Sequence, residues 1–88
     1  MKSDWIIYIL RCSDNSLYTG ITKNITKRLK EHNAGGKLAA KYTRARRPVT
    51  LVYKEHAASR SAAAKREHEV KQMDKNSKES LVSAHISH

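Results

Sequence analysis

The chain has 88 residues, 39% of them hydrophobic, which supports one globular domain and excludes a disordered chain or a second independent core. Its 18 lysines and arginines outnumber 8 aspartates and glutamates, so the net charge is +10. Such a charge attracts polyanions and makes nucleic acid the first candidate partner, but by itself it leaves an anionic membrane surface or a solvated basic surface open.

The first predicted element is a strand over Trp5–Leu10. This run of β-branched and aromatic residues is too short for a helix and apolar on both faces, which is typical of a central strand. It is also shorter than a signal-peptide core or a membrane span, so neither is expected. Cys12, the sole cysteine, is interpreted as a small core residue at the strand end, and we expect a cytoplasmic protein without an internal disulfide.

A hairpin is predicted after this strand. Four polar turn formers at 13–16 precede a second alternating run over Leu17–Ile21, as in two antiparallel partners. The hairpin would bring Tyr8 and Tyr18 onto neighbouring strands.

The next predicted element is a helix from about Asn24, a good N-cap, to Gly35-Gly36, which can supply a left-handed C-terminal residue. Ile25 and Leu29 would then face the sheet together. Arg28 and His32 are four residues apart and share a face that borders this apolar stripe.

Taken alone, Arg28 fits an ordinary surface cation and His32 a partly buried histidine near a helix end. Both residues are expected at the edge of the core, which is where a functional site would lie.

A basic segment follows, with one aromatic residue among its cations. We interpret it as a short helical turn or loop that contacts phosphates. Its candidate nucleic-acid-binding residues are Lys37, Lys41, Tyr42, Arg44, Arg46 and Arg47. Pro48 ends the segment, and a third strand is predicted over 49–53 with Val49, Leu51 and Tyr53 on one face.

An alanine-rich helix is predicted from about Ser59. Ala63, Glu67, Val70 and Met73 are spaced by four, three and three residues, which puts Glu67 inside the apolar stripe. A carboxylate there needs a partner, because burying an unpaired charge costs several kcal/mol. The partner is either a metal ion or a cation such as Arg28, and the residues alone leave both open. Glu69 points off the stripe toward solvent.

A last helix is predicted to be capped by Asn76 with Glu79 three residues later, and to serve packing only. Its buried residues are expected to be Leu81, Val82 and Ile86. The whole pattern predicts an α/β (α+β) fold in one domain over 1–88, a small three-stranded antiparallel sheet flanked by helices.

The ordered set of chemical residues resembles the GIY-YIG endonuclease superfamily. The match consists of Ile7-Tyr8, Tyr18-Thr19-Gly20, Arg28, His32 and Glu67. The stretches Tyr42-Thr43-Arg44, Arg47-Pro48 and Leu51-Val52 further resemble small stand-alone bacterial GIY-YIG proteins. Ile6 and Thr19 depart from the name-giving triplets, and Ile21 stands where the repair-nuclease branch has a lysine.

This resemblance implies metal-dependent hydrolysis of DNA phosphodiester bonds, in DNA repair or recombination. Tyr8 and Tyr18 would orient or deprotonate the attacking water, with Tyr18 preferred as the base and activated by Arg28, the metal ion or a lysine such as Lys23. Arg28 would neutralise the scissile phosphate and His32 would assist it. Glu67 would hold Mg²⁺ or Mn²⁺, and a single carboxylate suffices for an ion that keeps waters and binds substrate oxygens.

Two other readings remain. One is a nucleic-acid-binding module with weak or lost cleavage, in keeping with Ile21, and the other is a small basic structural protein. No small-molecule cofactor and no membrane partner is expected, and a protein partner could supply specificity.

Overall fold

The computed structural model describes residues 4–86, and the order of the elements along this part of the chain is ββααβαα. The strands are β1 (Ile6–Arg11), β2 (Leu17–Thr22) and β3 (Thr50–His56). The helices are α1 (Ile25–Ala34), α2 (Lys41–Arg44), α3 (Arg60–Gln72) and α4 (Lys75–Ile86). Within residues 4–86 no helix is long and apolar enough to cross a membrane.

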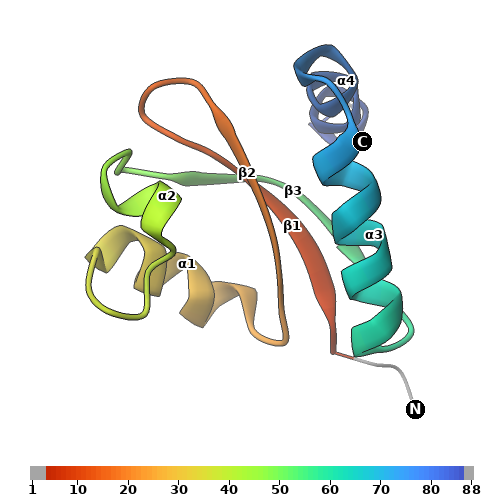
Figure 1. Ribbon diagram of the computed structural model, residues 1–88, viewed down its shortest axis with the longest axis horizontal. Coiled ribbons are helices and arrows are strands. Elements are labelled where there is room, and N and C mark those ends of the chain that lie inside the picture. The colour runs from red at the N-terminus through yellow and green to blue at the C-terminus, as the bar shows by residue number, and fades with distance from the viewer. Residues whose placement is uncertain (1–3, 87–88) are drawn as a thin grey trace.

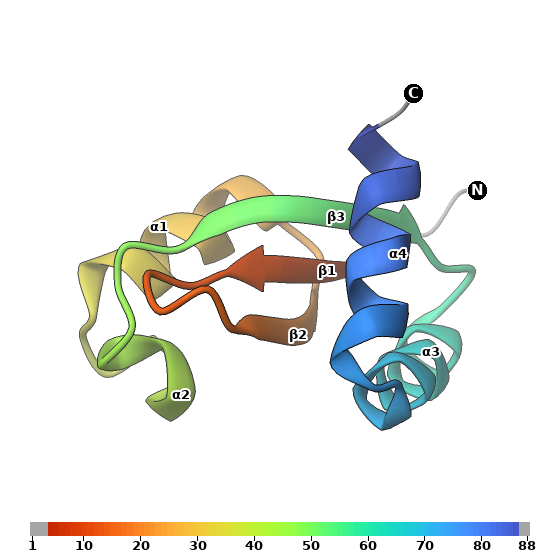
Figure 2. The same ribbon diagram turned by 90° about the horizontal axis from the view of Figure 1, so that it is seen from above.

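The described strands form one antiparallel sheet in the order β2-β1-β3, which confirms the predicted hairpin and the central position of β1. Helices α1 and α2 lie on one side of this sheet, and α3 and α4 lie on the other (Figure 1; Figure 2 gives the view from above). The fold class is therefore α+β, as the sequence predicts.

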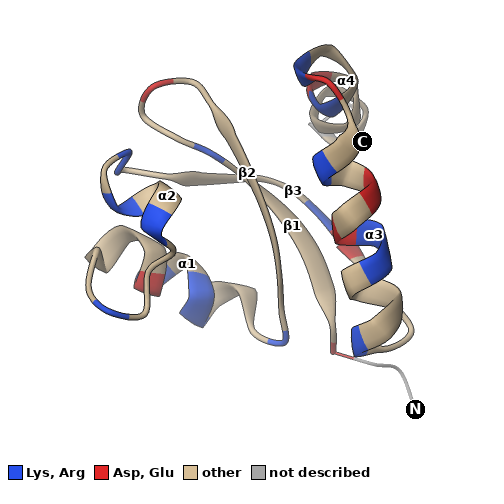
Figure 3. Cartoon of the chain, viewed as in Figure 1, with Lys and Arg blue, Asp and Glu red and all other residues tan. Residues whose placement is uncertain are grey.

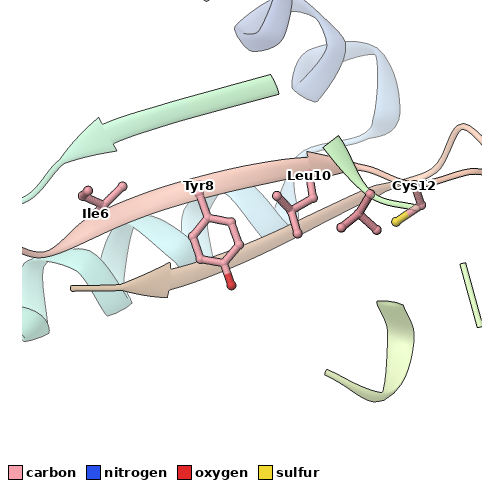
Figure 4. Packing of buried hydrophobic residues seen from close by; sticks show 5 residues of the cluster. Ile6, Tyr8, Leu10 and Cys12 are labelled. Atoms are coloured by element: carbon pink, nitrogen blue, oxygen red, sulfur yellow. The ribbon is translucent and has the colours of Figure 1, made fainter. Parts of the chain in front are cut away.

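Successive side chains of β1 point to opposite faces of the sheet, so the core has two halves. Ile6, Tyr8, Leu10 and Cys12 point to the same side (Figure 4), where α1 packs through Ile25 and Leu29. Ile9 points to the other side and packs against Val70 of α3 and Val82 of α4. Since β1 is buried on both faces, it can carry Tyr8 into a dry environment beneath α1.

Local signals set the ends of α1 where they were predicted. The side chain of Asn24 accepts a hydrogen bond from the Lys27 amide at 3.1 Å, and Gly35 ends the helix in the left-handed region with φ 72°. These two ends fix the phase of α1, so that Arg28 and His32 both lie toward the sheet.

The third strand differs from the prediction in length and in the direction of one side chain. It extends to His56, and its register with β1 shifts between Ile9 and Leu10. The irregularity sends Leu51 to the α1 side and Tyr53 to the α3 and α4 side, so the prediction that they share a face is wrong. A bulge inserts one extra residue and reverses the alternation beyond it.

The predicted capping box of the last helix is also wrong. The helix begins at Lys75, and Asp74 caps it, because its carboxylate accepts a hydrogen bond from the Ser77 amide at 2.8 Å. Glu79 instead forms two hydrogen bonds with the Arg11 guanidinium, at 2.6 and 2.8 Å, and joins α4 to the end of β1. Leu81 and Val82 pack as predicted, whereas the side chain of Ile86 lies outside the described residues.

Candidate active site

Tyr8 lies across the backbone of Gly20, its partner on β2. The two residues are paired in the antiparallel register, and the Tyr8 side chain is 1% exposed. The Cβ of any residue at position 20 would lie 2.5 Å from the Tyr8 hydroxyl oxygen and 2.7 Å from Cζ. Glycine is therefore needed here for space, because the buried ring occupies the volume that a side chain would fill.

We expect Gly20→Ala to displace the Tyr8 ring and to destabilise the fold by about 1–3 kcal/mol, the usual cost of overpacking. Urea unfolding measures the loss. Gly36→Ala is the matched control, because no atom lies within 4 Å of its added Cβ. Equal stability of the Gly20→Ala variant and the wild type would contradict the described position of Tyr8.

A chain of hydrogen bonds leads from Tyr8 to the backbone of the loop before α2. The Tyr8 hydroxyl lies 2.9 Å from His32 Nε2, and His32 Nδ1 lies 2.8 Å from Thr43 Oγ1. Thr43 donates to the Ala40 carbonyl at 3.0 Å. Since that carbonyl only accepts, Thr43 must accept from His32 Nδ1–H, which leaves Nε2 to accept the Tyr8 proton.

The environment keeps both groups of this pair neutral. Burial raises the pKa of Tyr8 to about 12; the nearby Arg28 guanidinium opposes this rise, and Tyr18 and Glu67 add to it. Burial also lowers the pKa of His32 to about 4, and the Arg28 charge acts in the same direction. At neutral pH, His32 is therefore an uncharged imidazole with its basic nitrogen directed at the Tyr8 hydroxyl.

We expect His32 to make stability fall as the pH drops from about 6.5 to about 4. Its folded pKa of about 4 lies below the ordinary 6.5, so the unfolded chain binds the proton first and the full stabilisation is present only above pH 6.5. The shift corresponds to about 3 kcal/mol as an upper bound. Urea unfolding at pH 7 and pH 4.5 measures it, and His32→Gln removes this part of the pH dependence.

Imidazole nitrogen NMR provides an independent check of the same prediction. A protonated Nδ1 and an unprotonated Nε2 at pH 7 are expected for His32. The opposite tautomer, or titration near pH 6.5, would contradict the hydrogen-bond assignment.

Tyr18 and Tyr42 stack beside this chain. Their ring centroids are 5.9 Å apart with planes at 26°, and the Tyr18 centroid lies 5.3 Å from that of His32. The Arg46 guanidinium lies 3.9 Å from the Tyr42 ring centroid and also binds Asp14 at 3.0 Å. Tyr42, which the sequence assigns to the basic segment, therefore adjoins the tyrosine pair.

Arg28 lies at the rim of the site. It pairs with Glu31 at 3.0 Å and donates to the Leu38 carbonyl, and it is close enough to Tyr8 to lower the pKa of that hydroxyl. A guanidinium held in this way remains charged and faces a buried oxygen. The predicted neighbourhood of Tyr8, Tyr18, Arg28 and His32 is present in the structure.

Glu67 approaches the site from α3. Its side chain is 23% exposed, and its carboxylate pairs with Lys71 at 3.3 Å. It lines an open pocket of about 510 Å³ together with Ile21, Arg60, Ser61 and Ala64. The negative charge of Glu67 adds slightly to the raised pKa of Tyr8, so the carboxylate lies within electrostatic range of that hydroxyl.

The residues around Glu67 suit an open Mg²⁺ site with one protein ligand better than a closed site in which several side chains enclose the ion. Within residues 4–86 no group of three or more His, Cys, Asp or Glu side chains could enclose an ion. One largely buried carboxylate on an open pocket suits an ion that keeps its waters and takes substrate oxygens.

The arginines of the basic segment bind the protein's own backbone. Arg44 donates to the Lys37 carbonyl, and Arg46 donates to the Tyr42 carbonyl. Arg47 donates to the carbonyls of Asn33, Ala34 and Arg44. These residues shape the loop around α2, and their predicted contacts with nucleic acid remain a prediction, as do those of Lys37, Lys41 and Tyr42.

Sequence reasoning missed two residues of the site and misplaced a third. Thr43 belongs to a stretch that resembles the family, but its hydrogen bond to His32 was not predicted, because His32 is eleven residues away and on another helix. Lys71 could have been found, since a lysine four residues after Glu67 is the usual helical ion-pair spacing. Lys23 lies at the Trp5 ring, 5.9 Å from its centroid, and not at Tyr18.

Known proteins with similar sequences share most of this chain. A UPF0213 protein from Desulfotalea psychrophila is 52% identical over 91% of the chain and 72% of its own length. Another from Natronomonas pharaonis is 50% identical over 93% of the chain and 94% of its own length. The solution NMR structure of a UPF0213 protein from Bacillus halodurans matches with a TM-score of 0.58 and 42% identity, over 91% of this chain and 83% of that one.

The model of the GIY-YIG catalytic domain matches residues 4–80, which contain both strands of the hairpin, α1, α2, β3 and all of α3. That range includes Tyr8, Tyr18, Arg28, His32 and Glu67. The chain belongs to the GIY-YIG domain family.

Proposed function

We propose that the protein is a Mg²⁺-dependent endonuclease that hydrolyses phosphodiester bonds of DNA. The observation that supports this most is the buried contact between Tyr8 and a neutral His32, with Arg28 and Glu67 close enough to shift the pKa of the same tyrosine. Perturbed pKa values around one group are typical of active sites. The net charge of +10 supports a polyanionic substrate.

We assign the role of general base to Tyr8 in place of Tyr18. The Tyr8 hydroxyl donates to His32 Nε2, so its oxygen can take a proton from water while its own proton moves to the imidazole. Phosphate negative charge near the site would raise the pKa of His32 and make it a better acceptor. Tyr18 then orients the water, with its ring held by the contacts to His32 and Tyr42.

Arg28 would bind the scissile phosphate, and the interaction of its charge with the Tyr8 hydroxyl supports this role. Glu67 would hold Mg²⁺, and the ion supplies charge neutralisation for the phosphate oxygens in the transition state. Lys71 neutralises Glu67 in the present structure and would give up that contact to the ion.

A labelled duplex, incubated with and without Mg²⁺, tests the proposal. Cutting that requires Mg²⁺ and is abolished by EDTA is the expected result. Binding without cutting would favour the second candidate, a nucleic-acid-binding module. That candidate rests on the Glu67–Lys71 ion pair, which already satisfies the carboxylate without a metal.

A further inference from the structure

Two cations lie within about 6 Å of the Trp5 ring centroid, at the end of the sheet farthest from α2. The Lys23 Nζ lies 5.9 Å from the ring centroid and the Arg60 Cζ lies 5.8 Å from it. Figure 3 shows basic residues at the β2–α1 connection and at the start of α3, near one another at the same end of the sheet. Both side chains are exposed, so the pair is open to a ligand.

Arg60 of this pair lines the Glu67 pocket. Arg60, Ala64 and Glu67 are spaced by four and three residues, which places them on one face of α3. All three line the pocket of about 510 Å³, and Ile21 of β2 lines it as well. Arg60 and Glu67 are seven residues apart, which is ~10 Å along the helix. The small side chain of Ala64 between them leaves room for a bound strand.

The local electrostatics favour an anion at this pair. Within residues 4–86, neither Lys23 nor Arg60 forms an ion pair with a carboxylate. Arg60 is the first residue of α3, a position where a cation opposes the helix dipole, and the first turn contains no acidic residue. A phosphate bound there would be attracted by both positive charges.

We propose that Lys23 and Arg60 bind a backbone phosphate of the DNA strand that neighbours the scissile phosphate at Glu67. The inference rests on the proposed function for the position of the scissile bond, and it identifies the substrate-contacting side of the pocket. The strand would then run over Ala64, between the cation pair and the metal ligand. The pair, with one cation in the β2–α1 connection and one at the start of α3, is thus a binding determinant separate from the basic segment around α2.

The test is the salt dependence of DNA binding, measured by fluorescence anisotropy of a labelled duplex without divalent ions. Loss of one phosphate contact in the Lys23→Ala/Arg60→Ala variant should flatten the slope of log K against log salt by about 0.9. The matched control is Lys30→Ala/Lys65→Ala, which removes two exposed lysines from α1 and α3 and should keep a slope near the wild-type value. An unchanged slope in the first variant overturns the proposal.

A second measurement needs no variant. Trp5 is the only tryptophan of the chain, so its emission reports on the proposed site alone. Binding of DNA should change that emission, because a phosphate draws the two cations away from the indole. Emission that stays constant through saturation with DNA overturns the proposal even if the double variant fails to fold. Arg60→Lys should retain both the emission change and the slope.

Failure of this inference can be told apart from failure of the proposed function. If the wild type cuts DNA and neither readout responds, the phosphate site is wrong and the nuclease assignment stands. If the wild type does not cut and both readouts respond, the phosphate site stands and the nuclease assignment is wrong.

Discussion

Glu67→Gln should lose Mg²⁺-dependent DNA cleavage, with a fall of at least about 10²-fold in rate, while the fold and the affinity for DNA stay near their wild-type values. The amide keeps the size of the side chain but removes the charge that would hold the ion. The structural cost is small, because Glu67 pairs with a half-exposed Lys71 four residues later in the helix, and such helical pairs are worth about 0.3–0.5 kcal/mol. Single-turnover cleavage at saturating DNA separates the two effects.

Glu69→Gln is the control for this variant. Glu69 lies on the same helix and pairs with Arg66 at 3.6 Å, but its side chain is 53% exposed and directed away from the pocket residues. Its substitution removes the same charge from α3 and should leave cleavage unchanged. Normal cutting by Glu67→Gln, or equal losses in both variants, would remove Glu67 from the role of metal ligand.

Tyr8→Phe should lower cleavage by about 10²–10⁴-fold, the usual contribution of a general base. The variant also leaves Nε2 of the buried His32 without its donor, so we expect a loss of stability of about 1–3 kcal/mol. Tyr18→Phe keeps the ring contacts with His32 and Tyr42 and should lose less activity. Cleavage rates are compared at saturating DNA, with folding confirmed by circular dichroism.

The comparison decides which tyrosine takes the proton. A larger loss in Tyr18→Phe than in Tyr8→Phe would return the role of base to Tyr18, the residue that the sequence resemblance favours. Wild-type cleavage in both variants would show that neither tyrosine acts on the attacking water.

The parts of the fold that the sequence predicts correctly depend on neighbours close in the chain. Asn24 and Gly35 cap α1 through contacts within four residues, so their residue types were sufficient evidence. The central strand was visible because β1 is apolar on both faces, and only a strand covered on both sides needs that composition. Because the two capped ends fix which face of α1 lies toward the sheet, Arg28 and His32 lie close to the tyrosines.

The features that the sequence did not predict depend on distant partners. Tyr53 changes face because of an irregular register with β1, which no pattern within β3 reveals. Glu79 looked like a capping residue, but Arg11, which lies 68 positions earlier, binds it more favourably. Tyr42 joins the site through its stacking on Tyr18, which requires the loop after α1 to fold back over the sheet.

The basic residues around α2 differ in whether they also stabilise the loop, and this difference determines what a substitution at each of them would change. A guanidinium that binds a carbonyl keeps its charge, so Arg44 and Arg47 contribute to both loop structure and attraction of polyanions. In the described part of the chain, the side chains of Lys37 and Lys41 form no hydrogen bond or ion pair, and they contribute charge only. We therefore expect a substitution at either lysine to change only the charge, whereas a change at either arginine alters the loop structure and the charge together.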